Sequence, residues 1–249
     1  MSRIVERLAA GAQRLGISLN EDQLGRFRIY YETLIEWNRR LNLTRITDYE
    51  EVQVKHFLDS LSCWLAIERL PGVPADLAGI DLQTVDVGSG AGFPGVALKL
   101  ILPSLRLTLL EATGKKADFL EFLVQRLELS QVRVIKARAE ELGQDAAHRE
   151  RYDLALARAV AGMATLAELT LPLVRIGGWV IAHKGDEPVA ETETAQNAIV
   201  TLGGQVQEIL PVRVPGLEAT RHLVVLEKVI STPVKYPRRP GMPAKRPLV

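Results

Sequence analysis

The sequence predicts an α/β protein built on a doubly wound, seven-stranded, mostly parallel sheet, with a helical extension ahead of it. Short apolar strands alternate with amphipathic helices over residues 82–202, which is the pattern of a parallel sheet covered on both faces. A glycine-rich turn directly follows the first of these strands. With 249 residues, 47% of them hydrophobic, the chain is long enough to bury the core of one such domain and a small extension.

The chain begins with a segment that is predicted to be helical. A short helix is expected over residues 4–15. Asn20 followed by Gln23 has the pattern of a helix cap with a capping box, and apolar residues then recur at helical spacing as far as Leu41. A third helix is expected over residues 48–70, where a proline stops it.

Strands and helices then alternate along the rest of the chain. The predicted strands are residues 82–87, 106–110, 132–136, 152–157, 179–183, 205–212 and 222–228. The predicted helices are residues 96–102, 116–127, 140–148, 163–174 and 191–202. Because no helix separates the last two strands, we expect them to form an antiparallel pair at one edge of the sheet. The proline-rich residues 233–247 are expected to form neither a helix nor a central strand.

Three parts of the chain differ in composition. They are an N-terminal helical segment packed on the core (residues 1–75), the sheet domain (residues 76–232) and a basic, proline-rich C-terminal tail (residues 233–249). The last fifteen residues carry five positive charges and no acid, although the whole chain has a net charge of only +1. Such a tail either binds phosphates or forms a solvated arm, and the sequence leaves both alternatives open.

Composition and charge argue against several classes of protein. The N-terminal residues carry charges where a signal peptide is apolar, and no apolar run of about eighteen residues occurs, so we expect a cytoplasmic protein without a membrane-spanning helix. Cys63 is the only cysteine, which excludes an internal disulfide and a cysteine-rich zinc site. The four histidines lack the spacing of metal ligands, so no metal is expected. We expect the protein to be a monomer.

The run DVGSGAGFPG, residues 86–95, constrains function more than any other part of the sequence. Its glycines follow a predicted strand directly, which indicates that another group approaches this backbone closely. The next strand ends in Glu111, nineteen residues past Gly92, about where nucleotide-binding folds place the acid that holds a ribose. Together these features predict a site for a nucleoside cofactor.

The spacing of the glycines favours S-adenosylmethionine as that cofactor. A dinucleotide fingerprint requires a third glycine at position 93, where the following helix approaches a pyrophosphate, but this chain has Phe93. S-adenosylmethionine carries no phosphate, so it does not require that glycine. An NAD-dependent oxidoreductase shares the strand, the glycines and the acid, and it is the nearest enzymatic alternative.

A parallel sheet presents its ligand at the carboxyl ends of its strands. Glu111 is placed there to accept both ribose hydroxyls. Short side chains at Ala112 and Ala139 leave room for an adenine ring, and Arg158 is placed to face the cofactor carboxylate. We therefore expect the cofactor to lie across these strand ends.

The residues at the strand ends also limit the reaction. Enzymes that methylate an exocyclic amine carry an Asn/Asp-Pro-Pro-aromatic turn after the fourth strand, and this chain has Ala-Arg-Ala-Val at residues 157–160. Methylation of pyrimidine carbon 5 needs a thiolate, but Cys63 lies far from the strand ends in sequence. An endocyclic nitrogen such as guanine N7 has an exposed lone pair and needs no base. The sequence therefore favours such a nitrogen as the methyl acceptor.

Several short motifs follow one another along nearly the whole chain. They are Trp37-Asn38, Asn42-Leu43-Thr44, KHFLDSL at residues 55–61, the glycine run at 86–95, Glu111 with Lys115-Lys116 and Phe119-Leu120, Arg138-Ala139-Glu140, RAVA at 158–161, Lys184-Gly185 and YPRRPG at 236–241. In these motifs and their order the chain resembles the small-subunit ribosomal RNA guanine-N7 methyltransferases, also called the glucose-inhibited division protein B family.

The resemblance implies a cytoplasmic enzyme with the class I (Rossmann-like) S-adenosylmethionine-dependent methyltransferase fold. It implies methylation of guanine N7 in the 530 loop of 16S ribosomal RNA, with residues 76–232 as the S-adenosylmethionine-binding domain. Combined with the strand ends, it predicts the cofactor-binding residues Gly88, Gly90, Phe93, Glu111, Ala112, Thr113, Ala139, Glu140 and Arg158. It supplies no residue for proton transfer, so we assign no catalytic residue.

Phosphate contacts are expected to hold much of the RNA. A-form RNA hides N7 in a deep, narrow groove, so the target base must lie in a loop or be unstacked. The candidate RNA-binding residues are Lys184, Lys55, Arg39, Arg40, Arg238 and Arg239. The expected partner is 16S ribosomal RNA or the small ribosomal subunit, and the sequence leaves open whether it is bound as naked RNA, as a precursor particle or as the assembled subunit. A non-catalytic RNA-binding protein that retains a nucleotide-binding fold is the remaining alternative.

Overall fold

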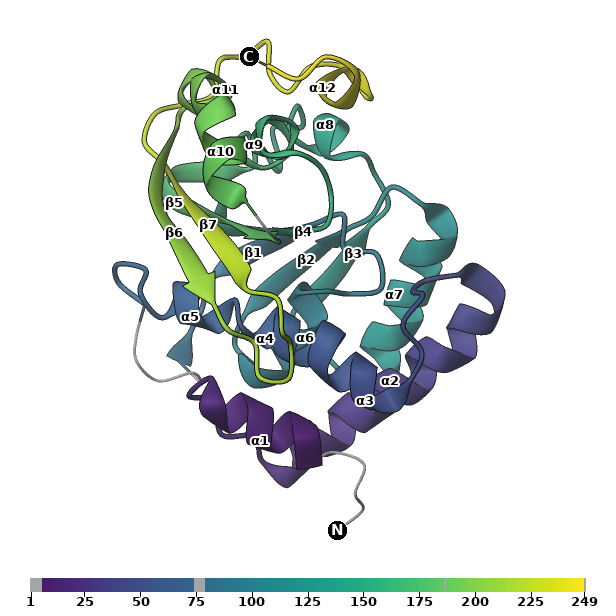
Figure 1. The fold of residues 1–249 in the computed structure, drawn as a ribbon. Coiled ribbons are helices and arrows are strands. Elements are labelled where there is room, and N and C mark those ends of the chain that lie inside the picture. The colour runs from purple at the N-terminus through teal and green to yellow at the C-terminus, as the bar shows by residue number, and fades with distance from the viewer. Residues whose placement is uncertain (1–5, 74–78, 186, 249) are drawn as a thin grey trace.

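A computed structural model describes residues 6–73, 79–185 and 187–248, whose elements form three layers (Figure 1). A seven-stranded sheet lies in the middle, and helices cover both of its faces. The strands are β1 (Gln83–Val87), β2 (Arg106–Leu110), β3 (Val132–Ile135), β4 (Tyr152–Arg158), β5 (Val174–Lys184), β6 (Gly204–Val212) and β7 (Arg221–Lys228).

The strand order across the sheet is β3-β2-β1-β4-β5-β7-β6. Neighbouring strands from β3 to β5 are parallel, and β7 is antiparallel to both β5 and β6. This confirms the predicted seven-stranded, mostly parallel sheet with an antiparallel pair at one edge. β1 and β4 lie side by side although β2 and β3 separate them in sequence, so the strand order reverses there. A ligand of a doubly wound sheet is expected at the carboxyl ends beside this reversal.

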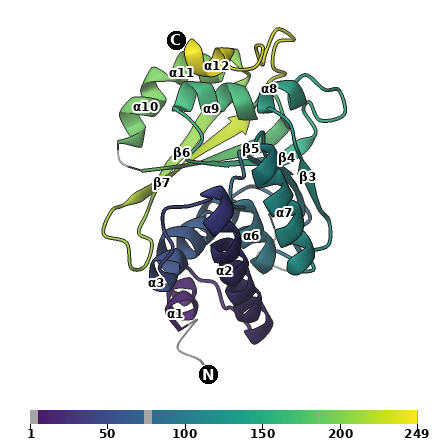
Figure 2. The same ribbon diagram turned by 90° about the vertical axis from the view of Figure 1, so that its right-hand side faces the viewer.

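The helices separate into two layers (Figures 1 and 2). One layer contains α1 (Glu6–Arg14), α2 (Glu21–Leu41), α3 (Tyr49–Val52), the π-helix η1 (Gln53–Leu58), α4 (Asp59–Leu61), α5 (Trp64–Ile67), α6 (Gly95–Ile101) and α7 (Gly114–Arg126). The other contains α8 (Ala139–Leu142), α9 (Met163–Thr170), α10 (Pro188–Thr194), α11 (Gln196–Thr201) and α12 (Met242–Lys245). Within the described residues, no helix combines the length and the apolar character that crossing a membrane requires.

Strand side chains alternate between two hydrophobic clusters, one under each layer of helices. Leu107 and Leu109 of β2 belong to the same cluster as Phe27 and Phe57 of the N-terminal helices. Leu110 belongs to the other cluster, which packs against α9 and α11. The N-terminal helices thus share a core with the sheet. The division into parts at residues 75/76 and 232/233 stays a prediction.

The N-terminal helices follow the predicted pattern from residue 6 to residue 52; residues 4 and 5 of the first predicted helix lie outside the described residues. The capping box at the start of α2 is present: the Asn20 side chain accepts the Gln23 N–H at 2.8 Å, and the Gln23 side chain accepts the Asn20 N–H at 3.0 Å. Asp48 caps the third helix where its start was expected, with its carboxylate accepting the N–H of Glu51. These are local interactions, which explains why the sequence identifies them.

The third predicted helix does not continue to residue 70 as one α-helix. Its residues Gln53–Leu58 form a π-helix, and turns occur at Ser62 and Cys63. The Ser60 and Ser62 hydroxyls donate to the backbone carbonyl oxygens of His56 and Asp59, which competes with regular helical hydrogen bonding. π-Helical turns are frequent at functional sites, and this one carries Lys55 and His56.

Later helices also differ from the prediction. Residues 140–148 are helical only in α8, because the Asp145 carboxylate accepts the N–H of Ala147 and turns the chain. Residues 191–202 divide between α10 and α11, which meet at Ala195, and residue 174 already belongs to β5. The expectation of no helix in residues 233–247 is wrong, since α12 forms there. Pro243 stands in its first turn, where a missing N–H is harmless.

The C-terminal tail packs against α8 and α9 and is not a solvated arm. Arg238 donates from Nε and Nη2 to the two carboxylate oxygens of Glu168, at 2.9 and 2.6 Å, and the Glu168 side chain is fully buried. Gly241 donates its N–H to Glu140 at 2.8 Å. The Arg149 guanidinium donates to the carbonyl oxygens of Thr232, Pro233 and Tyr236.

We predict that Arg238→Gln lowers the free energy of unfolding by about 3 kcal/mol, because it leaves the buried Glu168 carboxylate unpaired. Arg239→Gln is the matched control: Arg239 is exposed, so its replacement should change stability by no more than about 0.5 kcal/mol. Urea unfolding of both variants measures the difference. Equal stabilities would show that the tail adds nothing through this ion pair.

Candidate functional site

The glycine-rich loop after β1 is shaped by its own glycines and by α2. Gly88, Gly90 and Gly92 all have positive φ, at +72°, +57° and +92°. The Tyr30 hydroxyl of α2 donates to the carbonyl oxygen of Ala91 at 2.6 Å. A Cβ on Gly92 would lie 2.6 Å from that hydroxyl. Both the backbone conformation and the approach of Tyr30 therefore require glycine at position 92.

Asp86, the last but one residue of β1, anchors the other end of the loop. Its Oδ2 accepts the N–H of Gly95 at 2.9 Å, and a Cβ on Gly95 would lie 2.7 Å from that oxygen. Its Oδ1 is buried and has no hydrogen-bond partner among the described residues. Burial raises the pKa of the Asp86 carboxyl from 3.8 to about 7. A buried polar atom without a partner beside a glycine loop fits a site whose ligand supplies further contacts.

Glu111 links the ends of β1 and β2. One carboxylate oxygen accepts the N–H of Gly90 at 3.0 Å and the other accepts the N–H of Thr113 at 2.7 Å. Each oxygen has capacity for a second donor, so the carboxylate retains acceptors for a pair of hydroxyls. A Cβ on Gly90 would meet only the carbonyl oxygen of Gly88 within 4 Å, and Ala112 and Thr113 are exposed. This acceptor beside open space fits the sugar of a nucleoside.

Phe93 joins the loop to the N-terminal helices. Its ring is stacked between Tyr30, at a centroid distance of 5.1 Å, and His56, at 4.8 Å. The Arg158 guanidinium lies 5.0 Å from the centroid of the same ring. Phe93 is 5% exposed, so its ring mainly packs between the loop and η1.

The residues after β3 lie against the tail. Ala139 is buried at the start of α8, and Glu140 beside it accepts the N–H of Gly241. The Glu140 carboxylate thus has a structural partner that the sequence did not indicate. Its predicted contact with the cofactor remains a prediction.

Arg158, at the end of β4, belongs to a buried charge cluster centred on Asp59. The Asp59 carboxylate accepts from Arg158 Nη1 at 2.8 Å and from Arg221 Nε at 2.9 Å. His183 Nε2 lies 3.1 Å from the Asp59 carbonyl oxygen. Burial lowers the pKa of His183 to about 4, as it does for His56, so both imidazoles are neutral at pH 7.

A cavity of about 380 Å³ opens beside this cluster. Its lining includes Lys55, His56, Asp59, Arg158, His183, Lys184 and Arg221. These side chains come from η1, α4, β4, β5 and β7, and the sheet and the N-terminal helices bring them together. The sequence prediction missed Asp59 and Arg221 as members of the site. A signal existed for Asp59, because it interrupts a run of apolar residues in its helix.

The structure separates the predicted RNA-binding residues into two groups. Lys55 pairs with Glu51, Lys184 donates to Glu191 at 2.9 Å, and Arg238 pairs with Glu168. Arg39, Arg40 and Arg239 are exposed, and none of the three forms an ion pair with a residue that the structure describes. Trp37 packs against Phe119 of α7, so the end of α2 lies near the start of α7, at the carboxyl edge of the sheet.

No group of three or more histidine, cysteine, aspartate or glutamate side chains that could hold a metal ion occurs in the described parts of the chain.

Comparisons with known proteins identify the family of the chain. The model of the family described as GidB, rRNA small subunit methyltransferase G, matches residues 23–224. The chain is 50% identical over 245 residues to the ribosomal RNA small subunit methyltransferase G of Dehalococcoides mccartyi, which covers 98% of this chain and 100% of that protein. It is 44% identical over 241 residues to the protein of the same name from Alkaliphilus metalliredigens, with 97% of each covered.

A solved structure shows the same fold at low sequence identity. A putative transferase from Pyrococcus horikoshii superposes with a TM-score of 0.52. The match covers 70% of this chain and 64% of that one, at 12% identity. It is a likeness of fold alone.

We predict that Glu111→Ala weakens S-adenosylmethionine binding by about 1.5 to 3 kcal/mol, the range for hydrogen bonds to a charged group. Glu121→Ala, at an exposed position on α7, is the matched control and should bind the cofactor normally. Titration calorimetry measures both affinities. An unchanged affinity for Glu111→Ala would remove this residue from the cofactor site.

The raised pKa of Asp86 predicts a pH-dependent stability. Between about pH 4 and pH 7 the unfolded chain loses this proton while the folded protein keeps it, so the free energy of unfolding falls as the pH rises. Asp86→Asn removes this titrating group. The free energy of unfolding of the variant minus that of the unmodified protein should therefore rise between about pH 4 and pH 7 and stay constant above pH 7. Urea unfolding at several pH values measures the difference, and a constant difference would contradict the assignment.

Proposed function

Because this chain belongs to the GidB family of small-subunit ribosomal RNA methyltransferases, we propose that the atom it methylates is N7 of a guanosine in the 530 loop of 16S ribosomal RNA. The reaction class follows from the family: the chain is an enzyme that transfers a methyl group from S-adenosylmethionine to the ribosomal RNA of the small subunit. Its fold is the class I methyltransferase fold. Neither an oxidoreductase nor a non-catalytic RNA-binding protein fits that family.

One observation carries the proposal: the glycine-rich loop and the cavity beside Asp59 are adjacent, because Phe93 of the loop contacts Arg158 of the cavity. Phe93 belongs to the loop, and the Arg158 guanidinium that lies over its ring also pairs with Asp59 and lines the cavity. A cofactor held by Glu111 and the loop would therefore lie next to a base held in the cavity. We propose that the following residues bind the cofactor: Gly88, Gly90, Phe93, Glu111, Ala112, Thr113, Ala139, Glu140 and Arg158.

The cavity suits a guanine better than other bases. Guanine presents two acceptors, O6 and N7, on one edge, and arginine is its commonest specific partner. Arg221 uses Nε on Asp59, which leaves its terminal N–H groups for a ligand such as O6. Lys55 is about half exposed at the cavity and is suited to a phosphate.

The chemistry requires positioning and no proton transfer by a side chain. S-adenosylmethionine, which Glu111 and the glycine-rich loop would hold, would supply a methyl group bonded to a sulfonium sulfur; its transfer to the N7 lone pair would break that S–C bond and leave S-adenosylhomocysteine. Asp59 is held by two arginines and is not free to act as a base. His56 and His183 stay neutral at pH 7 because burial lowers their pKa to about 4, so they add no positive charge beside a cationic cofactor. Alignment of donor and acceptor is the contribution of the protein.

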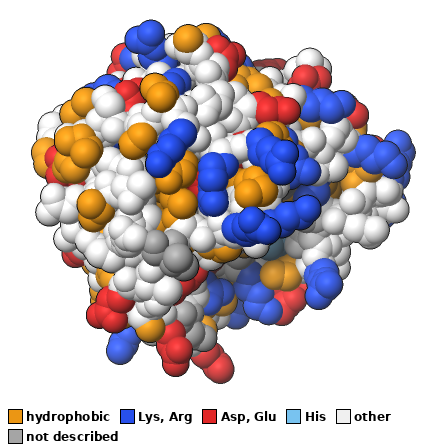
Figure 3. Space-filling model, turned by 90° about the horizontal axis from the view of Figure 1, so that it is seen from above, with side chains coloured by type: hydrophobic (Ala, Val, Ile, Leu, Met, Phe, Trp, Pro, Cys, Tyr) orange, Lys and Arg blue, Asp and Glu red, His pale blue; other side chains and the backbone are white. Residues whose placement is uncertain are grey.

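Exposed basic residues provide surfaces for the RNA backbone. On the tail, the exposed cations are Lys235, Arg239, Lys245 and Arg246. Lysine and arginine side chains gather on the face of the molecule where the tail lies (Figure 3). Arg39 and Arg40, at the carboxyl edge of the sheet, are a second candidate surface. Arg238 and Lys184 are engaged by carboxylates, as Lys55 is, but their side chains are only 23% and 11% exposed against 40% for Lys55, so we assign them a smaller part.

We further propose that the enzyme acts in the cytoplasm as a monomer. Its substrate is 16S ribosomal RNA, either naked, in a precursor particle or in the assembled small subunit. Size measurement in solution, with and without RNA, tests the monomer.

The proposed target atom predicts the product of the reaction. Naked 16S ribosomal RNA, precursor particles and assembled subunits are each incubated with the enzyme and labelled S-adenosylmethionine. Strand scission by borohydride and aniline, which cleaves at N7-methylated guanosine, should map the label to the 530 loop in at least one substrate. Label that maps to another atom or another loop would refute the target while leaving the reaction class intact.

A further inference from the structure

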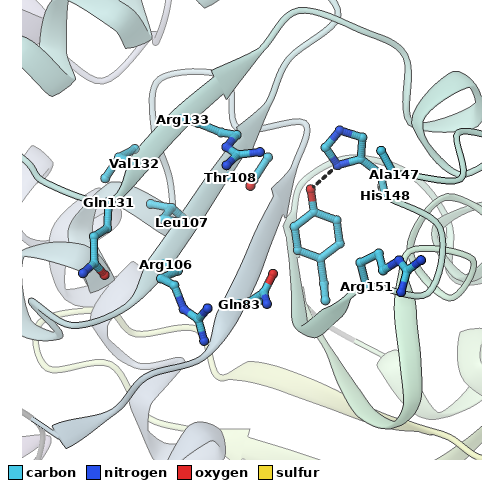
Figure 4. A pocket seen from close by; sticks show the side chains of 11 residues that line it. Gln83, Arg106, Leu107, Thr108, Gln131, Val132, Arg133, Ala147, His148 and Arg151 are labelled. Carbon is cyan, nitrogen blue, oxygen red and sulfur yellow. Dashed lines mark hydrogen bonds between the residues drawn. The ribbon is translucent and has the colours of Figure 1, made fainter.

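A second cavity, of about 470 Å³, lies at the amino ends of the strands (Figure 4). Its lining includes Gln83, Arg106, Val132 and Tyr152, which begin β1, β2, β3 and β4. The glycine-rich loop and Glu111 follow the opposite ends of β1 and β2. At about 3.3 Å per residue, the length of β2 separates the two sites by roughly 15 Å. The cavity is therefore distinct from the cofactor site.

The segment where the predicted helix 140–148 ends early contributes to the cavity, since Ala147 and His148 line it. α8 stops at Leu142, and residues 143–151 turn back towards β4. The Arg149 guanidinium holds this turn to the tail and also donates to the carbonyl oxygen of Gly143 at 2.8 Å. Thr108 of β2 and Arg133 of β3, which a longer helix would cover, line the cavity instead.

The lining of this cavity is cationic. Figure 4 shows Arg106, Arg133 and Arg151 around it, on β2, on β3 and just before β4. No aspartate or glutamate is among the lining residues. Arg106 donates to Asp81 at 2.7 Å, outside the lining, but neither Arg133 nor Arg151 forms an ion pair with any residue that the structure describes. Two guanidinium groups are thus available to a ligand.

An anion would pair with these guanidinium groups, which have no carboxylate beside them in the lining. The planar fork of arginine matches the oxygens of a phosphate, so a phosphate is the best-suited anion. Two hydroxyl groups also line the cavity: that of Thr108 and that of Tyr152, which lies 2.7 Å from Nδ1 of His148. His148 and Tyr152 are stacked nearly parallel, at an interplanar angle of 9°, which fixes both polar groups at the cavity wall.

The volume indicates more than a bare phosphate ion, because small-molecule sites measure about 300 to 1,000 Å³. Leu107 and Val132 provide apolar wall beside the cations. We propose that this cavity binds the phosphate ester of a nucleotide, with Arg133 or Arg151, the lining cations without an ion-pair partner among the described residues, contacting the phosphate. The phosphate is carried either by a free nucleotide or by an RNA chain. This site does not rest on the target atom proposed above.

The test compares Arg133→Gln/Arg151→Gln with the control Arg14→Gln/Arg126→Gln, which removes two exposed arginines from α1 and α7. S-adenosylhomocysteine fills the cofactor site so that the probes report on the cavity. Inorganic phosphate and uridine 5′-monophosphate are titrated calorimetrically in one arm. A fragment of 16S ribosomal RNA is titrated at several salt concentrations in the other. Thermal unfolding confirms that both variants fold.

A free-nucleotide site predicts saturable binding of uridine 5′-monophosphate that the cavity variant weakens by about tenfold or more and the control leaves unchanged. An RNA site predicts that only the RNA arm responds, with a salt dependence that is shallower by about 0.7 in slope for each lost phosphate contact. The proposal is overturned if neither arm changes, or if the control variant weakens binding as much as the cavity variant. Methyl transfer at another atom would not affect either arm.

Discussion

The stacking of Phe93 between Tyr30 and His56 is the contact on which the rest of the site depends. It fastens the glycine-rich loop to α2 and η1. Tyr30 of α2 holds the loop backbone, and Asp59 of α4, which directly follows η1, holds Arg158 and Arg221. The N-terminal helices therefore contribute residues to the site at the carboxyl edge of the sheet. They also share its hydrophobic core. Without these helices, the sheet would lack the cavity-lining residues Lys55, His56 and Asp59.

Local patterns made much of this structure predictable. The strands, the capping box of α2 and the left-handed glycines each depend on residues close in sequence, and Glu111 follows from the fixed length of a strand-helix-strand unit. The cluster around Asp59 was not predictable in the same way, because its partners lie about 100 and 160 residues away and meet only in the folded chain. The Asp145 turn after α8 is local, but the contact of Arg149 with the tail joins residues 83 and 87 positions apart in the chain.

Charge balance distinguishes the two cavities. Beside the cofactor loop, the buried carboxylate of Asp59 compensates two guanidinium groups, and burial keeps two histidines neutral. That environment tolerates a cationic cofactor and still offers donors to a base. At the amino ends of the strands, the lining holds three arginines and no carboxylate. Lys55 and Lys184 of the first cavity also pair with carboxylates, as does Arg106 of the second. Arg133 and Arg151 are the lining cations without an ion-pair partner among the described residues, which favours an anion in the second cavity.

The position of β7 has a consequence for how the chain is made. β7 lies between β5 and β6, so the outer edge of β5 has no neighbouring strand until residues 221–228 have been synthesised. A nascent chain that has already built the cofactor loop would still present unpaired backbone donors and acceptors at that edge, a template for association with other chains. Closure of the sheet therefore requires residues 221–228, and until they have emerged the edge of β5 can associate with other chains.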